Sequence, residues 1–203
     1  MKLLSFEAAG RQRFGAATDG GIVDLTGKLG PGLDTLRSAL EAGALGRAGE
    51  VVAQAKPEFG FDEVAFLMPV PYPEKIICVG VNYGNRNAEY KDGSELPKWP
   101  SVFARFPGSF VGHRARLVRP PESIQLDYEG EIAIVIGKAG RRIAESQAET
   151  HIAGLTCLNE GTIRDWTRHG KFNVTQGKNF DARGSIGPWM VTADEFAGFD
   201  NLR

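Results

Sequence analysis

The chain has 203 residues, of which 42% are hydrophobic, so it is long enough for one sizeable core or for a small and a larger domain. Its formal net charge of −1 and its pI near 6.3 exclude the basic surface typical of proteins that bind nucleic acid or anionic membranes. No apolar run approaches membrane-spanning length, and Glu7 and Arg11 interrupt the short apolar start, which argues against a signal peptide. We therefore expect a soluble, cytoplasmic protein that acts on a small molecule.

Residues 1–70 predict a small α/β domain. Two short strands are expected at 3–6 and 21–25, and leucines at helical spacing follow between 33 and 40. Prolines then occupy alternate positions 69, 71 and 73, which forbids a helix and favours an extended linker. The domain boundary is therefore expected after residue 70.

Residues 71–203 predict a second, β-rich domain. Apolar runs typical of strands lie at 75–80, 101–106, 126–138, 152–158 and 188–191, with a short helix expected within 141–151 and a polar loop at 177–181. Many short strands with few helices indicate an α+β fold dominated by β-structure.

Both cysteines lie in these apolar runs. A free thiol at Cys78 or Cys157 is expected to pack like a small hydrophobic side chain. Two such cysteines indicate a reducing compartment and argue against a disulfide framework, with one disulfide pair as the alternative.

The strand expected at 126–138 carries two carboxylates on one face. Successive side chains of a strand point to opposite faces, so Glu129 and Glu131 are expected to share a face with Ala133 and Val135. Both faces are expected to be covered, because the opposite face is also largely apolar. That opposite face consists of Tyr128, Ile132, Ile134 and Ile136.

A third carboxylate suggests a metal site. Two glutamates two residues apart on a strand most often mark a solvated face, but carboxylates that converge beside apolar side chains need a cation between them. Glu160 follows the strand expected at 152–158, where side chains converge on a site. Glu129, Glu131 and Glu160 together offer three oxygen donors, which suit Mg²⁺.

Cations and histidines narrow the chemistry. Arg164 could bind a substrate carboxylate and Lys178 could stabilise a developing enolate, although a surface ion pair is the alternative for either residue alone. The three histidines have no spacing that indicates a zinc site or a Ser-His-Asp arrangement. Gly-rich phosphate loops do not occur, which argues against nucleotide and nicotinamide chemistry.

Four stretches in this order along the chain resemble the motifs of the fumarylacetoacetate hydrolase family. They are residues 75–83, 127–138, 159–166 and 177–189. The resemblance implies a mixed β-sandwich roll preceded by a small N-terminal domain, usually as a homodimer. It also implies Mg²⁺ or Mn²⁺ bound by Glu129, Glu131 and Glu160.

The same resemblance implies an enzyme that hydrolyses a C–C bond of a small diketo acid, of the acylpyruvate or fumarylacetoacetate type. Relatives of that family isomerise or decarboxylate similar enol acids. In this scheme Lys178 stabilises the enolate and Arg164 helps to hold the substrate. Further substrate contacts are expected from Arg105, Tyr83 and Asn82.

The sequence departs from the family pattern in three places. Glu160 stands where an aspartate is usual, and Arg86 stands where a histidine is usual, three residues before Glu89. A guanidinium cannot take a proton from water, so either Glu89 acts alone, His113 serves as the base, or the reaction is not hydrolysis.

The third departure is length. The chain ends at Arg203, before further strands that family members carry, so the catalytic domain is expected to lack its C-terminal part. The alternatives to a hydrolase are thus an isomerase or decarboxylase of a related enol or oxo acid, and an incomplete, non-catalytic member.

Overall fold

The computed structural model describes residues 1–203 apart from 84–97, 172, 200–201 and 203. The strands are β1 (Lys2–Ala8), β2 (Arg11–Thr18), β3 (Gly21–Asp24), β4 (Ala65–Phe66), β5 (Ile76–Gly80), β6 (Ser101–Arg105), β7 (Phe110–Val111), β8 (Leu126–Asp127), β9 (Gly130–Ile136), β10 (Ile152–Asn159), β11 (Thr162–Ile163), β12 (Gly184–Ile186) and β13 (Met190–Thr192). The helices are α1 (Leu36–Glu41), α2 (Leu45–Gln54), α4 (Arg164–His169) and α5 (Thr175–Lys178), with short 3-10 helices η1 (Pro107–Ser109), η2 (Glu145–His151) and η3 (Ala193–Glu195). The prediction of a β-dominated fold with few helices is confirmed.

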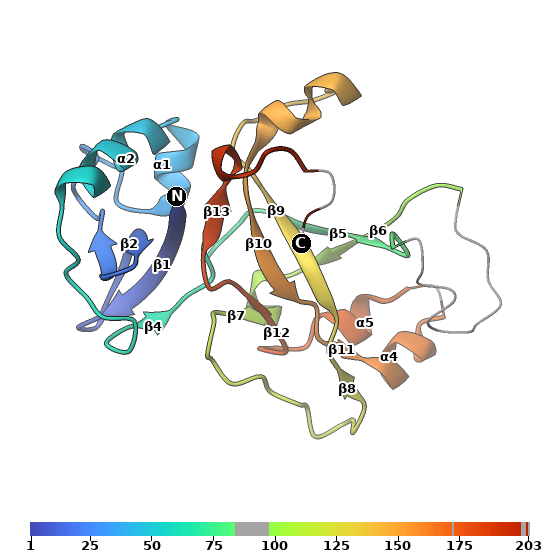
Figure 1. The fold of residues 1–203 in the computed structure, drawn as a ribbon. Helices are drawn as coiled ribbons and strands as arrows, with labels where there is room; N and C mark the ends of the chain where they lie inside the picture. The colour runs from blue at the N-terminus through green and yellow to red at the C-terminus, as the bar shows by residue number, and fades with distance from the viewer. Residues whose placement is uncertain (84–97, 172, 200–201, 203) are drawn as a thin grey trace.

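One sheet runs through most of the molecule. In the described residues it has nine strands, in the order β3-β2-β1-β13-β10-β12-β7, with β4 beside β1 and β9 beside β10. β1 and β13 pair antiparallel, so strands from the two ends of the chain lie side by side (Figure 1). The sheet therefore continues across the boundary expected after residue 70, and the division into domains stays a prediction.

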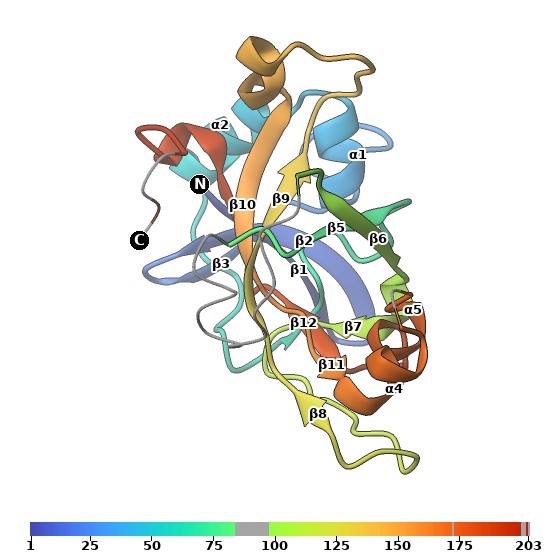
Figure 2. The ribbon, with the colours of Figure 1, turned by 90° about the vertical axis from the view of Figure 1, so that its right-hand side faces the viewer.

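The N-terminal half of this sheet is covered by helices. α1 and α2 lie above β1 and β2 in Figures 1 and 2, and their apolar faces pack with the buried side chains of the strands. Thr35 caps α1, because its hydroxyl accepts a hydrogen bond from the Ser38 amide at 3.0 Å. No helix in the described part of the chain is long and apolar enough to cross a membrane.

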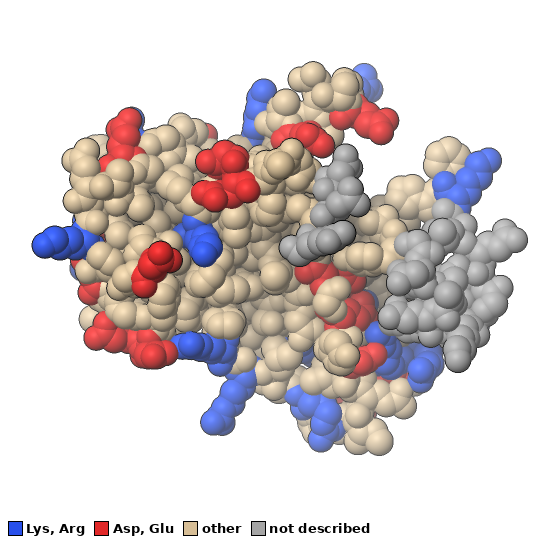
Figure 3. Space-filling view, viewed as in Figure 1, with Lys and Arg blue, Asp and Glu red and all other residues tan. Residues whose placement is uncertain are grey.

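The outer face of β9 is exposed, so the expectation that both faces are covered was wrong. Ile132, Ile134 and Ile136 are 51%, 56% and 62% exposed, and Tyr128 is 80% exposed. Cys157, which lies opposite Ile132 on β10, is also exposed rather than packed as a core thiol. In the space-filling view, the surface around β10 that the grey residues leave open is mostly free of charged atoms (Figure 3).

Candidate metal centre

The three glutamates meet where the long β9–β10 pair ends. The last paired residues of these two strands are Gly130 and Asn159. The chain bends between β8 and Gly130, so the strand expected at 126–138 is divided into β8 and β9. The Glu160 amide donates to the Glu129 carbonyl at 2.8 Å, and the Glu129 amide donates to the Asn159 side chain at 3.1 Å. These bonds fix Glu129 and Glu160 beside each other, and Glu131 follows on β9.

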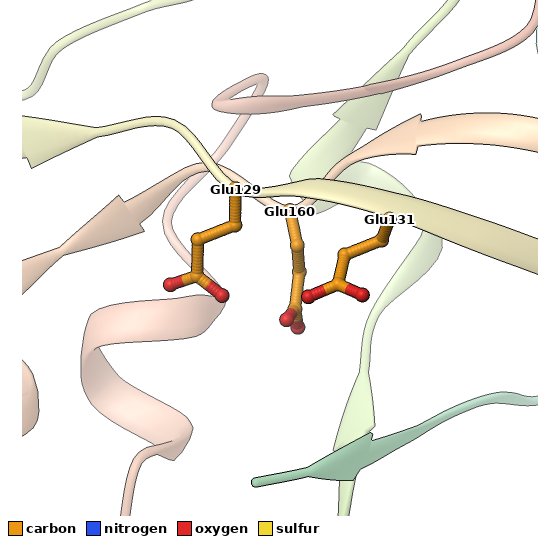
Figure 4. Close-up of side chains that lie close together, drawn as sticks. All are labelled: Glu129, Glu131 and Glu160. Atoms are coloured by element: carbon orange, nitrogen blue, oxygen red, sulfur yellow. The ribbon is translucent and has the colours of Figure 1, made fainter. Parts of the chain in front are cut away.

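The three carboxylates form one cluster. One oxygen from each of Glu129, Glu131 and Glu160 lies within 4.8 Å of the others. All three side chains project to the same side of β9, with Glu160 between the other two (Figure 4). Glu160 is buried and the other two are half-buried. Three hard oxygen donors at this spacing fit a divalent cation such as Mg²⁺ or Mn²⁺.

Lys178 reaches the cluster from α5, which occupies part of the segment expected to be a loop. Its ammonium donates to both oxygens of Glu129, at 3.1 and 3.0 Å, and to Glu160 Oε2 at 3.0 Å. Gly177 makes this approach possible, because a Cβ there would lie 2.4 Å from Thr167 Cγ2 and 2.7 Å from the Ile163 carbonyl. Only glycine lets α5 pack this closely on β11 and α4.

Two arginines complete the cluster. Arg164, the first residue of α4, contacts Glu129 Oε1 at 2.9 Å and Asp127 at 2.8 Å. Arg105, at the end of β6, contacts Glu160 Oε1 at 3.3 Å, and its side chain is fully buried. Its guanidinium stacks 4.2 Å from the centre of the Phe110 ring. Three cations thus lie among the three carboxylates of the cluster and Asp127.

The surroundings shift the pKa values of Glu129 and Glu131 in opposite directions. Burial raises the pKa of Glu129, but Lys178, the Thr162 hydroxyl and Arg164 lower it more, so the net pKa lies below its ordinary value. Burial raises the pKa of Glu131, and the charges of Glu160 and Glu129 raise it further against the opposing hydrogen bond from Tyr83. Glu129 is therefore stabilised as an anion, whereas Glu131 is not.

The other residues expected at the site are placed unevenly. Tyr83 lies beside Glu131, and burial followed by that carboxylate raises the pKa of its hydroxyl. Asn82 is exposed. His113 packs edge-on against Phe66, with ring centres 5.1 Å apart, on the side of the N-terminal core.

Arg86 and Glu89 lie outside the described residues. Among the contacts that are described, no histidine reaches the carboxylate cluster. A base that would activate water is therefore not placed by the described part of the chain.

Residue patterns alone missed three members of the site. The Thr162 hydroxyl donates to Glu129 Oε1 at 2.6 Å, and Asn159 holds the Glu129 backbone. Cys78 lies beside Glu160, and burial followed by that carboxylate raises the pKa of its thiol to about 12. The signal for Cys78 was strand alternation, since it shares the inward face of β5 with Ile76; Thr162 and Asn159 adjoin Glu160 in sequence but carry no pattern of their own.

The chain is similar in sequence to proteins of known name. Human mitochondrial oxaloacetate tautomerase FAHD2B is 38% identical over 188 residues, which are 91% of this chain and 59% of that protein. Oxaloacetate tautomerase YisK of Bacillus subtilis is 39% identical over 137 residues, covering 66% of this chain and 44% of that protein. The chain therefore spans about half to three fifths of the length of these relatives.

A solved structure shares the fold over almost the whole chain. The fumarylacetoacetate hydrolase of Exiguobacterium antarcticum superposes with a TM-score of 0.74 and 30% identity, over 97% of this chain and 68% of that one. The model of the family described as fumarylacetoacetate (FAA) hydrolase C-terminal matches residues 75–203, which include every member of the carboxylate cluster. The chain belongs to the fumarylacetoacetate hydrolase family.

Proposed function

We propose that this protein is a metal-dependent enzyme that interconverts the keto and enol forms of a small 2-oxo acid of the oxaloacetate type. The observation that carries the proposal is the cluster itself, in which Lys178, Arg105 and Arg164 lie among three carboxylates. This arrangement is electrophilic and suited to negative charge on a substrate oxygen. The name oxaloacetate tautomerase, borne by relatives that are 38% and 39% identical, supports it.

Glu129, Glu131 and Glu160 would hold the metal. Their oxygens suit Mg²⁺ and Mn²⁺ equally, and we propose Mg²⁺ as the resident ion, with Mn²⁺ as a substitute. A bound divalent ion would supply Lewis-acid polarisation of the 2-oxo group. The Thr162 hydroxyl donates to Glu129 and fixes the orientation of that ligand, and Tyr83 lies beside Glu131.

The side chains around the cluster would bind the substrate and stabilise the negative charge that develops on it. Keto–enol exchange moves one proton between C3 and the oxygen on C2 and breaks no carbon–carbon bond, so it needs no activated water. Lys178 contacts both Glu129 and Glu160 from α5, and its ammonium would stabilise negative charge on the C2 oxygen. Arg164, which is partly exposed, would bind a substrate carboxylate.

A second candidate is hydrolytic cleavage of a diketo acid. The 30% identity to a solved fumarylacetoacetate hydrolase favours it. Hydrolysis needs a base for the attacking water, and Arg86 cannot serve as one because its guanidinium keeps its proton. Glu89 would have to act alone. The tautomerase therefore ranks first.

The experiment measures both reactions on one preparation. Loss of the ultraviolet absorption of enol oxaloacetate reports tautomerisation, and pyruvate release from a short acylpyruvate reports C–C hydrolysis, each with Mg²⁺ and with EDTA. We expect metal-dependent acceleration of the first reaction and none of the second. Pyruvate release that depends on metal would favour the hydrolase, and no acceleration of either reaction would refute the proposed chemistry for this chain.

The assembly and compartment are also proposals. We propose a homodimer, as the family resemblance implies, and sedimentation velocity would measure it directly. The cytoplasmic location expected from the sequence stays a prediction, since the human relative is named mitochondrial.

A further inference from the structure

The ammonium of Lys178 is held by the oxygens that a metal would need. An ammonium has three N–H donors, and three contacts of 3.0–3.1 Å run from Lys178 to Glu129 Oε1, Glu129 Oε2 and Glu160 Oε2. The side chain is only 7% exposed. Lys178 therefore binds three of the carboxylate oxygens that a metal held by Glu129 and Glu160 would use.

Other donors contact the same two carboxylates. Arg105 contacts Glu160 Oε1, while Thr162 and Arg164 both contact Glu129 Oε1. A metal that takes either oxygen of Glu129 must take one that already bonds to Lys178. A divalent cation therefore competes with an ammonium, and it adds positive charge close to Lys178, Arg105 and Arg164.

A displaced ammonium needs a new partner. Lys178 is too buried to be solvated freely, and a buried charge that loses its partner is strongly destabilising. The Phe103 ring, 5.3 Å from the ammonium, offers a cation–π contact but no hydrogen-bond acceptor. An anion bound at the same place would supply both an acceptor and a negative charge beside the ammonium.

We propose that Lys178 couples metal binding to binding of the acid substrate, so that each strengthens the other. The metal alone binds weakly because it must take oxygens from Lys178, and the substrate's carboxylate or oxo oxygen then becomes the new acceptor of the ammonium. This inference rests on the proposed function, because it assumes the metal site and the 2-oxo acid. Coupling of this kind is reciprocal and typically amounts to about 5-fold to 150-fold.

The test measures Mn²⁺ affinity, not activity. Electron paramagnetic resonance of free Mn²⁺ is recorded during titration of the wild type and of Lys178→Gln, with and without saturating oxalate as a dianionic mimic of the 2-oxo acid end. Lys138→Gln is the control for loss of one positive charge, since Lys138 is exposed beyond the end of β9. Lys178→Met, which keeps the apolar stem, replaces Lys178→Gln if the latter does not fold.

We expect oxalate to tighten Mn²⁺ binding to the wild type and to Lys138→Gln by about tenfold or more. The neutral Lys178 variant should bind Mn²⁺ more tightly than the wild type without oxalate, and should gain less from oxalate. Equal oxalate effects in the wild type and the Lys178 variant, or weaker Mn²⁺ binding by that variant alone, would overturn the coupling role. A wild type that binds no Mn²⁺ in either condition would instead overturn the proposed metal enzyme.

Discussion

Glu129 and Glu131 lie two residues apart, yet they should affect the metal-free fold in opposite ways. Glu129→Gln removes a carboxylate that accepts from Lys178, Thr162 and Arg164, and should lower the free energy of unfolding by about 1–3 kcal/mol. Glu131→Gln removes a carboxylate that is repelled by its neighbours and should leave that free energy unchanged or raise it. Denaturant unfolding in EDTA at pH 7 measures both.

The pH dependence of the two variants provides the control. The pKa of Glu131 is raised in the folded state, so its contribution is fully favourable below its ordinary value of 4.5 and is lost as the pH rises through the folded pKa. The pKa of Glu129 is lowered, so its contribution is present above 4.5 and is lost as the pH falls through the folded pKa. The destabilisation by Glu129→Gln should therefore shrink on acidification below 4.5; a constant difference down to pH 3 would contradict this assignment.

Arg183 is a buried charge whose guanidinium has no hydrogen-bond partner in the described part of the chain, although the Phe180 ring lies 4.7 Å from it and Asp181 attracts it. Its side chain is fully buried, and none of its three guanidinium nitrogens has a hydrogen-bond partner there. Burial, followed by repulsion from Arg105, lowers its pKa to about 10. Arg183→Met should therefore raise the free energy of unfolding by about 1–4 kcal/mol, as for other buried charges replaced by apolar residues. A thermal melt that shows a lower midpoint for Arg183→Met would contradict this account.

At this scale the sequence predicted the three acids and all three cations, Arg105 through the family resemblance, but not their connections. Alternation along a strand placed Glu129 and Glu131 on one side, and Glu160 at a strand end, because those rules depend only on backbone geometry. The difference in pKa between Glu129 and Glu131 depends on Lys178 and Thr162, which approach from other elements. Local patterns carry no information on such tertiary contacts.

α5 positions Lys178, and a single methyl group should disturb it. Gly177→Ala would place a Cβ against Thr167 and the Ile163 carbonyl, so α5 must move away from β11. We expect a loss of about 1–3 kcal/mol in stability and weaker retention of Lys178 at Glu129. Gly46→Ala in α2 is the matched control: a Cβ there meets nothing within 4 Å, and the change should stabilise by about 0.5–1 kcal/mol.

Equilibrium denaturation of the two glycine variants measures this difference. Equal stability of Gly177→Ala and the wild type would show that α5 adapts without loss. The prediction of a loop at 177–181 could not foresee this element, because a four-residue helix produces too little periodicity to register. The bend that separates β8 from β9 was also missed. The two-residue spacing of apolar side chains continues from Leu126 and Tyr128 to Ile132, so the sequence predicts one unbroken strand.

One face of β9 that the sequence predicted to be covered is exposed to solvent. Apolar residues on both sides of β9 predicted a strand covered on two faces, but Ile132, Ile134 and Ile136 point outward in the single chain. In the described residues β9 pairs along one edge only, with β10. Hydrophobicity indicates that a face prefers to be covered, and it cannot indicate whether the cover comes from the same chain.

Three sheets converge on the cluster, so occupation of the site should stabilise the whole molecule. Arg105 belongs to the separate β5–β6 sheet, Glu160 follows β10 of the main sheet, and Arg164 follows β11 of the β8–β11 sheet. Mn²⁺ and oxalate bound together at about 100 times their dissociation constant should add about 2.7 kcal/mol to the free energy of unfolding. For a chain of this size that corresponds to a rise of about 5–10 °C in Tm.

Differential scanning calorimetry with Mn²⁺ alone, with oxalate alone and with both measures this stabilisation. The rise should require both ligands if Lys178 opposes metal binding by itself, and Glu131→Gln should abolish it because one of the three oxygen donors is lost. The Glu7→Gln variant is the control, because Glu7 is an exposed carboxylate on β1 outside the cluster. A rise that persists in Glu131→Gln would mean that the ligands bind elsewhere, and the three carboxylates would then hold the sheets together without a metal.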